Sequence, residues 1–246
     1  VRRQRQMCIR DRGNKMDERW RRWYECSLCE QQYHGVVMHA LGWACWKTYL
    51  ERPETDRHRI RAMNMLGKGL YRAGHHEDAL SVSEAELAMK RRLSAPEEVI
   101  LTVQGNLANL YGAVGRCEQA LQLRRDVYSG YLNLLGEEHE GTLKAALNYA
   151  ASLKDLWRFE EAKALLRRTT PVARRALGAS HIATLKLRWI YAQTLYKADA
   201  VTLDDLREAV ETLEETARTA RRVLGSEHPF VGGIEVNLRN ARAALR

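Results

Sequence analysis

The stretch that decides the fold is LGEEHEGTL at residues 135–143, because closely related stretches recur later in the chain. LGASHIATL follows at 177–185 and LGSEHPFVG at 224–232, at intervals of 42 and 47 residues. In each stretch a glycine can adopt the positive φ that ends a helix, and an acidic or hydroxyl residue suits the start of the next helix. The recurrence predicts a repeated helix–turn–helix unit of about 42 residues.

Two series of alanines keep the same phase as this junction. The first series is Ala108, Ala150 and Ala192, and the second is Ala79, Ala120, Ala162 and Ala209. A small side chain lets two helix backbones cross within about 8 to 10 Å while neighbouring Leu and Tyr side chains fill the grooves. One alanine on each helix of a pair therefore predicts an all-α fold, a right-handed α-solenoid of about four such repeats plus a C-terminal helix.

The full pattern resembles the tetratricopeptide repeat of the kinesin light chain type. It consists of NLA or NYA (106–108 and 148–150), a turn such as FEEA (159–162), and the LGxxHxxTL junction. The resemblance covers residues 57–246 and implies an array that binds a peptide or partner protein in a concave groove. The first unit departs from the pattern, because LSAPEE at 93–98 replaces the glycine–histidine junction.

Composition restricts the class of protein. Hydrophobic residues make up 45% of the 246 residues, enough for a core, and only four prolines interrupt runs rich in Ala, Leu, Glu and Arg. No stretch approaches the roughly 20 apolar residues that span a bilayer, and no leader with a cleavage site is recognisable. Five cysteines, unevenly placed, do not indicate a disulfide framework. We expect a cytoplasmic protein with no membrane partner.

Of the net charge of +9, +4 comes from the first twelve residues, VRRQRQMCIRDR, which hold five arginines and one aspartate. This stretch resembles translated adaptor sequence, and we assign 1–12 as a non-native or disordered segment; a basic arm that attracts phosphates is the alternative. The arginine pairs at 174–175 and 221–222 indicate a solvated helix face, since no aromatic residues interleave them to stack bases. No nucleic-acid partner is expected.

Residues 13–56 differ from the repeats, because they are rich in Trp, Tyr and Cys. Cys26 and Cys29 have the C-x-x-C spacing at which two thiolates hold one zinc ion. The further candidate ligands are His34, His39 and Cys45. The segment resembles the last knuckle of a truncated RING-like finger; the alternative is a buried aromatic cap, which a terminal repeat needs. Zinc is thus the one candidate cofactor, and otherwise none is expected.

The recurring histidines do not indicate catalysis. His139, His181 and His228 occur once per unit, too far apart to share an ion, so we expect them to cap or pack the next helix. The chain contains no phosphate-binding glycine loop, no G-x-S-x-G and no H-E-x-x-H. We therefore expect a protein that is not an enzyme.

A peptide-binding groove is expected on the helix faces opposite the alanines. Asparagine occurs two positions before Ala108, one position after it, and two positions before Ala150. These residues are Asn106, Asn109 and Asn148. The same register adds Arg61, Asn64, Lys68, Lys144, Lys186 and Gln193. Amides can pair with the backbone of an extended peptide, and the cations favour acidic side chains. We expect an interaction scaffold that binds a protein or peptide; the alternative, a substrate-recruiting arm of a RING-like ubiquitin ligase, depends on the knuckle alone.

Overall fold

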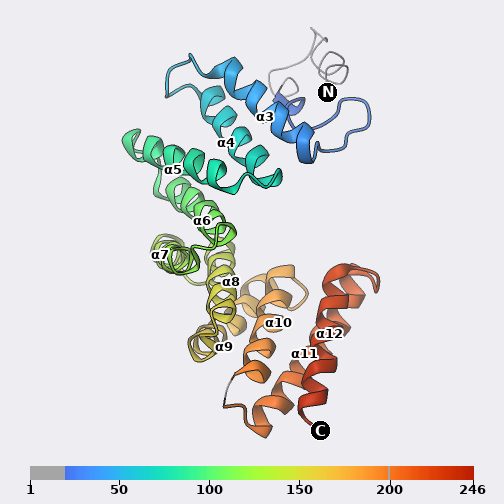
Figure 1. The fold of residues 1–246 in the computed structure, drawn as a ribbon. Coiled ribbons are helices and arrows are strands. Elements are labelled where there is room, and N and C mark those ends of the chain that lie inside the picture. The colour runs from blue at the N-terminus through green and yellow to red at the C-terminus, as the bar shows by residue number, and fades with distance from the viewer. Residues whose placement is uncertain (1–19, 199) are drawn as a thin grey trace. The chain divides into compact units, whose positions relative to one another are not determined.

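A computed structural model of the chain describes residues 20–198 and 200–246, and these residues form ten α-helices (Figure 1). The helices are α3 (Gly35–Tyr49), α4 (Arg57–Arg72), α5 (His76–Arg92), α6 (Glu97–Ala113), α7 (Cys117–Leu135), α8 (Glu140–Asp155), α9 (Phe159–Leu177), α10 (Ile182–Lys197), α11 (Leu203–Leu224) and α12 (Pro229–Ala244). The predicted all-α helical repeat fold is confirmed. The segment 1–12 lies outside the described residues.

Contacts gather the described helices into two compact units, the first ending at Arg116 and the second comprising Cys117–Arg246. The boundary falls inside the array that we predicted for residues 57–246. In the second unit, α7 packs on α8, and each later helix packs on the one before it. Helix α10 also contacts α8 and α12, so it lies in the middle of this unit.

In the first unit, α3 packs closely against α4 because glycines lie where the two helices meet. A Cβ atom at Gly69 would lie 2.9 Å from the carbonyl oxygen of Met38, and one at Gly42 would lie 3.1 Å from that of Met65. Aromatic side chains from the preceding segment add to this core, and Trp20 packs on Tyr49 with ring centroids 5.7 Å apart. The segment before the repeats therefore has the packing expected of an aromatic cap.

The predicted alanine positions are buried in both units. Every alanine of the two series is at most 3% exposed. The first series is Ala108, Ala150 and Ala192, and the second is Ala79, Ala120, Ala162 and Ala209. Leucines such as Leu166 and Leu213 surround the alanines of the second unit and complete its core. The alanines lie inside the core, as the small-residue argument requires.

The recurring junctions end one helix and cap the next. The glycines have positive φ angles of 81°, 91° and 85° at Gly136, Gly178 and Gly225. The Nδ1 atom of each histidine accepts a hydrogen bond from a backbone N–H two residues later, at 3.1 Å for His139, 3.3 Å for His181 and 3.1 Å for His228. Each bond satisfies a donor that the first turn of a helix leaves unpaired. The interpretation of the histidines as capping residues agrees with this geometry.

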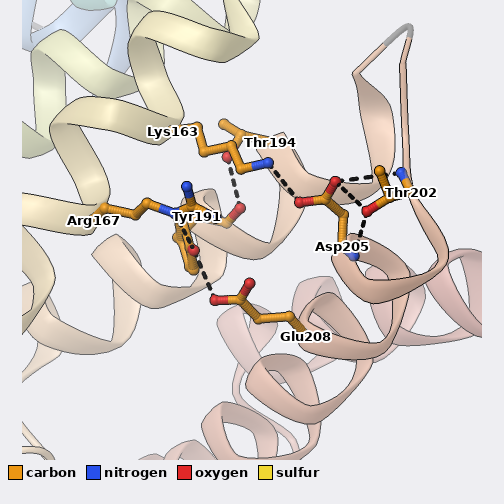
Figure 2. Close-up of polar contacts among 7 residues, drawn as sticks. All are labelled: Lys163, Arg167, Tyr191, Thr194, Thr202, Asp205 and Glu208. Carbon is orange, nitrogen blue, oxygen red and sulfur yellow. Dashed lines mark hydrogen bonds and ion pairs between the residues drawn. The ribbon is translucent and has the colours of Figure 1, made fainter.

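Polar contacts join three helices of the second unit (Figure 2). The Nζ atom of Lys163 in α9 lies 2.5 Å from Oδ1 of Asp205 in the first turn of α11. Arg167 donates to the hydroxyl of Tyr191 in α10 at 3.1 Å, and that hydroxyl donates to Glu208 at 2.7 Å. Both contacts tie the second helix of one repeat to the second helix of the next.

Trp157 occupies a turn position that glycine takes elsewhere in the chain. The turns after α4 and α6 contain Gly74 and Gly115 at φ of 84° and 80°, whereas Trp157, after α8, has a φ of 61°. In each turn this residue's N–H donates to the carbonyl three residues earlier, which for Trp157 is Lys154 at 3.1 Å. The left-handed region costs an L-residue about 1 to 2 kcal/mol. The residue is 73% exposed, and its ring packs edge-on against that of Phe159 with centroids 5.7 Å apart, so packing offsets only part of that cost.

We expect Trp157→Gly to leave the free energy of unfolding unchanged or to raise it by up to about 1 kcal/mol, because relief of backbone strain offsets the flexibility of glycine in the unfolded chain. Urea unfolding followed by far-UV circular dichroism measures this. Leu156→Gly is the matched control, since its φ of −94° suits any residue and its half-buried side chain is lost. A Trp157→Gly variant as destabilised as the control would contradict the prediction.

Candidate functional site

Four of the nine predicted groove residues surround one cavity in the first unit. Asn64 and Lys68 of α4 lie on one side, and Asn106 and Asn109 of α6 lie on the other. The cavity has a volume of about 160 Å³. Its remaining lining residues are Gly67, Tyr71, Ser83, Glu86, Val103 and Leu110. The cavity therefore combines amides, a cation and an acid with an apolar wall.

A second cavity adjoins the first and is cationic. It shares Asn64 and Lys68 with the first cavity and adds Arg61 and Arg72 from the same helix, together with Trp20. The guanidinium of Arg61 lies 5.3 Å from the centre of the Trp20 ring, close enough for a cation–π contact. The volume of this cavity is about 460 Å³. Its three cations place positive charge along one face of α4.

The acid in the first cavity, Glu86, was missed by the sequence argument. Its side chain is 7% exposed, and its Oε1 atom accepts a hydrogen bond from Nδ2 of Asn64 at 2.7 Å. Burial raises the pKa of Glu86, while the hydrogen bond from Asn64 and the charges of Lys90 and Lys68 oppose that shift. At this cavity an acid thus joins the predicted amides and the predicted cation among the lining residues.

A signal for Glu86 was present in the sequence. Ala79, Ser83, Glu86 and Lys90 follow one another at steps of four, three and four residues, so they share one face of α5. The buried Ala79 marks that face as the inner one. The predicted groove residues all lie on the first helix of a pair, whereas Glu86 lies on a second helix, α5.

In the second unit the predicted residues lie on the helix surfaces or in the core. Lys144, Asn148 and Lys186 are exposed, and the Nζ atom of Lys144 lies 2.7 Å from Oε1 of Glu140. Gln193 is 4% exposed, so a peptide cannot reach it in this structure. The physical reason is the central place of α10, which α8, α9, α11 and α12 all contact.

The candidate zinc ligands do not assemble into a site. Cys45 is fully buried in the core between α3 and α4, and burial raises the pKa of its thiol to about 12, whereas zinc binds the thiolate. Cys26 is half-buried and Cys29 is exposed, in a turn closed by a bridge between Glu25 and Gln32. In residues 20–198 and 200–246, no three His, Cys, Asp or Glu side chains are grouped so that they could hold a metal ion.

The two histidine candidates differ in their surroundings. His34 immediately precedes α3, and its exposed side chain forms no capping hydrogen bond. The Nε2 atom of His39 accepts a hydrogen bond from the indole N–H of Trp43 at 3.0 Å, and its ring stacks on that of His75 with centroids 4.8 Å apart. The described residues thus do not support the zinc knuckle, and the ubiquitin-ligase alternative loses the feature on which it depended.

The fold and its cavities define a helical-repeat protein with polar clefts between its helices. Models of the tetratricopeptide repeat match residues 99–175 and 201–230, so the chain contains tetratricopeptide repeats. These matches indicate no catalytic family. Sequence comparison with curated proteins finds no match. No helix in the described part of the chain is long and apolar enough to cross a membrane.

Solved structures with the same fold include kinesin light chain-like proteins. BtubC (BKLC) from P. vanneervenii is 17% identical with a TM-score of 0.70, over 84% of this chain and 82% of that one. A putative kinesin light chain from Podosopora anserina is 22% identical with a TM-score of 0.60, over 76% and 86%. A Rap protein complexed with Competence and Sporulation Factor is 16% identical with a TM-score of 0.55, over 85% and 58%. At these identities the likeness concerns the fold alone.

Proposed function

We propose that the protein is a protein–protein interaction scaffold whose first unit binds an extended peptide segment of a partner protein. The observation that carries the proposal is the cavity between α4 and α6, around which Asn64, Lys68, Asn106 and Asn109 gather. Tetratricopeptide repeats generally mediate protein–protein interactions, which agrees with this use. The free cysteines, such as the exposed Cys29, suit a reducing cytoplasm.

The chemistry of the two cavities suits a peptide backbone with acidic side chains. Asn106 is exposed at the cavity, so its amide can donate to a peptide carbonyl and accept from a peptide N–H. Arg61, Lys68 and Arg72 in the adjoining cavity favour a carboxylate of the same peptide. On the second unit, Lys144, Asn148 and Lys186 present similar exposed groups, which we propose also contact the partner.

We expect Asn106→Ala to weaken binding of an acidic peptide by about fivefold to tenfold, because the peptide backbone loses a hydrogen bond worth about 1 kcal/mol. The probe is a fluorescein-labelled peptide of glutamate, serine and leucine, blocked at both ends, and the readout is fluorescence anisotropy. Binding should also weaken with added salt, since exposed charges are screened beyond about 8 to 10 Å at physiological ionic strength.

Asn133→Ala is the matched control for this experiment. Asn133 is exposed on α7 and lies outside both cavities of the first unit. Asn148→Ala tests the second unit separately, and we expect a smaller loss there because Asn148 lies on an open surface. Equal affinity of the wild type, the Asn106→Ala variant and the control would rule out the cavity as the peptide site.

A further inference from the structure

We infer that the cavity between α4 and α6 receives a basic, hydrogen-bond-donating side chain of the bound segment, and that Glu86 selects it. This inference rests on the proposed function, because it specifies which residue of a bound peptide enters the cavity. It also changes the expected ligand from a uniformly acidic peptide to one that carries a basic residue beside an acidic one.

The carboxylate of Glu86 is buried and only partly paired. Asn64 donates to Oε1 of Glu86, and no ion pair of Glu86 exists among residues 20–198 and 200–246. Lys68 and Lys90 attract the Glu86 carboxylate, but neither of them lies within ion-pair distance of it. A carboxylate has about four acceptor sites, and neither oxygen of Glu86 is both fully buried and unpaired, so the acceptor sites that Asn64 leaves unfilled are open to a ligand in the cavity. The carboxylate therefore favours a ligand that brings its own donors.

The shape of the cavity agrees with a long basic side chain. Val103 and Leu110 form an apolar wall, along which the methylene stem of an arginine or lysine can pack while its charged end reaches Glu86. A guanidinium or ammonium group supplies several donors and the opposite charge. An acidic side chain would face repulsion from the same carboxylate, which opposes the attraction of Lys68 in this lining, so the position beside Glu86 favours a basic side chain.

The adjoining cavity accounts for an acidic neighbour in the ligand. The two cavities share Asn64 and Lys68, yet one contains Glu86 and the other contains Arg61 and Arg72. A negative charge from α5 and positive charges from α4 thus lie in adjoining cavities. A segment with a basic residue next to an acidic residue matches both cavities at once, whereas a segment of a single charge matches one of them.

The pH dependence of binding follows from the groups around Glu86. Asn64 and Lys68 face it from α4, Lys90 lies on its own helix α5, and α6 contributes the uncharged Asn106 and Asn109 to the cavity. A cationic ligand binds the carboxylate form. Because burial raises the pKa of Glu86, affinity should fall as the pH is lowered through that raised value.

The test uses two small probes with the full chain, N-acetyl-arginine amide and N-acetyl-norleucine amide, titrated by NMR at pH 7 and again at about pH 5. The wild type should bind the arginine probe about tenfold more tightly than the norleucine probe, a ratio equivalent to about 1.4 kcal/mol. Glu86→Gln should remove that preference and its pH dependence, because the amide retains the acceptor for Asn64 but carries no charge.

Glu84→Gln is the matched control, since Glu84 is exposed on the same helix and its Oε1 atom accepts from the Tyr111 hydroxyl at 2.9 Å. It should keep the arginine preference. Thermal unfolding checks the fold: at pH 7 Glu86→Gln should not lower the midpoint, because ionised Glu86 is destabilised by burial.

Each outcome decides the inference. Equal binding of the two probes by the wild type, or an arginine preference that survives Glu86→Gln, would overturn it. The acidic peptide separates this failure from that of the proposed function. If that peptide binds and depends on Asn106 while the probes bind equally, only the inference about Glu86 fails. If the peptide does not bind but the arginine preference depends on Glu86, the proposed acidic-peptide site fails and the basic-side-chain site stands.

Discussion

Replacing Ala150 with phenylalanine is expected to lower the free energy of unfolding by about 2 to 3 kcal/mol, at the upper end of the usual cost of overpacking a core. Ala150 is fully buried in α8, within the core of the second unit that includes Leu166 and Leu185. A phenyl ring has no room there unless α8 moves. Because α8 contacts α7, α9 and α10, the displacement should spread to all three neighbours.

The midpoint of thermal unfolding, followed by far-UV circular dichroism, measures the effect of Ala150→Phe. Asn148→Phe is the control, since Asn148 lies on the exposed face of the same helix, two residues away. Its midpoint should stay close to that of the wild type. If both variants unfold at the wild-type temperature, the helices around Ala150 can repack and the small-residue explanation of the alanine series is wrong.

The second large effect is expected for Asp205→Asn, which should lower the free energy of unfolding by about 2 kcal/mol at pH 7. Figure 2 shows Asp205 between Lys163 of α9 and Thr202 at the start of α11. Its hydrogen bonds to Lys163 and Thr202 lower the pKa of Asp205 to about 2. The two charged side chains are only 15% and 13% exposed, so solvent screens their attraction weakly.

The sign of the pH dependence follows from this lowered pKa. A carboxylate whose pKa is lower in the folded state stabilises the fold fully above its unfolded pKa of about 3.9, and this stabilisation is lost as the pH falls towards 2. The difference in the free energy of unfolding between the wild type and Asp205→Asn should therefore be constant near neutral pH and should become smaller below about pH 4. Urea unfolding at pH 7 and pH 3 measures both values.

Asp204→Asn is a matched control at the adjacent position. Asp204 also forms an ion pair, with Arg207 at 3.2 Å, but the Asp204 side chain is 92% exposed. Exposed ion pairs contribute about 0 to 1 kcal/mol, so this variant should lose little stability. If the two variants lose equal stability, the contact between Lys163 and Asp205 does not hold α9 to α11 as the structure indicates.

The sequence alone determined the repeat and the helices that build it. The glycines at 136, 178 and 225 end helices, the histidines three residues later cap the next ones, and the alanines occupy buried positions as predicted. These features depend on backbone conformation, on donors within one turn and on side-chain size, and all three can be inferred from residues close together in the chain.

Only the tertiary structure decided which polar residues share a cavity. Asn64 and Asn106 line one cavity. Gln193 has the same position in its repeat as Asn109, but Gln193 is buried because four helices surround α10. Glu86 lines the cavity from α5, the second helix of its pair. The predicted groove residues come from the first helix of each pair and therefore do not include it. The exposure of a side chain depends on every helix packed around it, and helices distant in sequence supply much of that packing, so no pattern along one helix determines it.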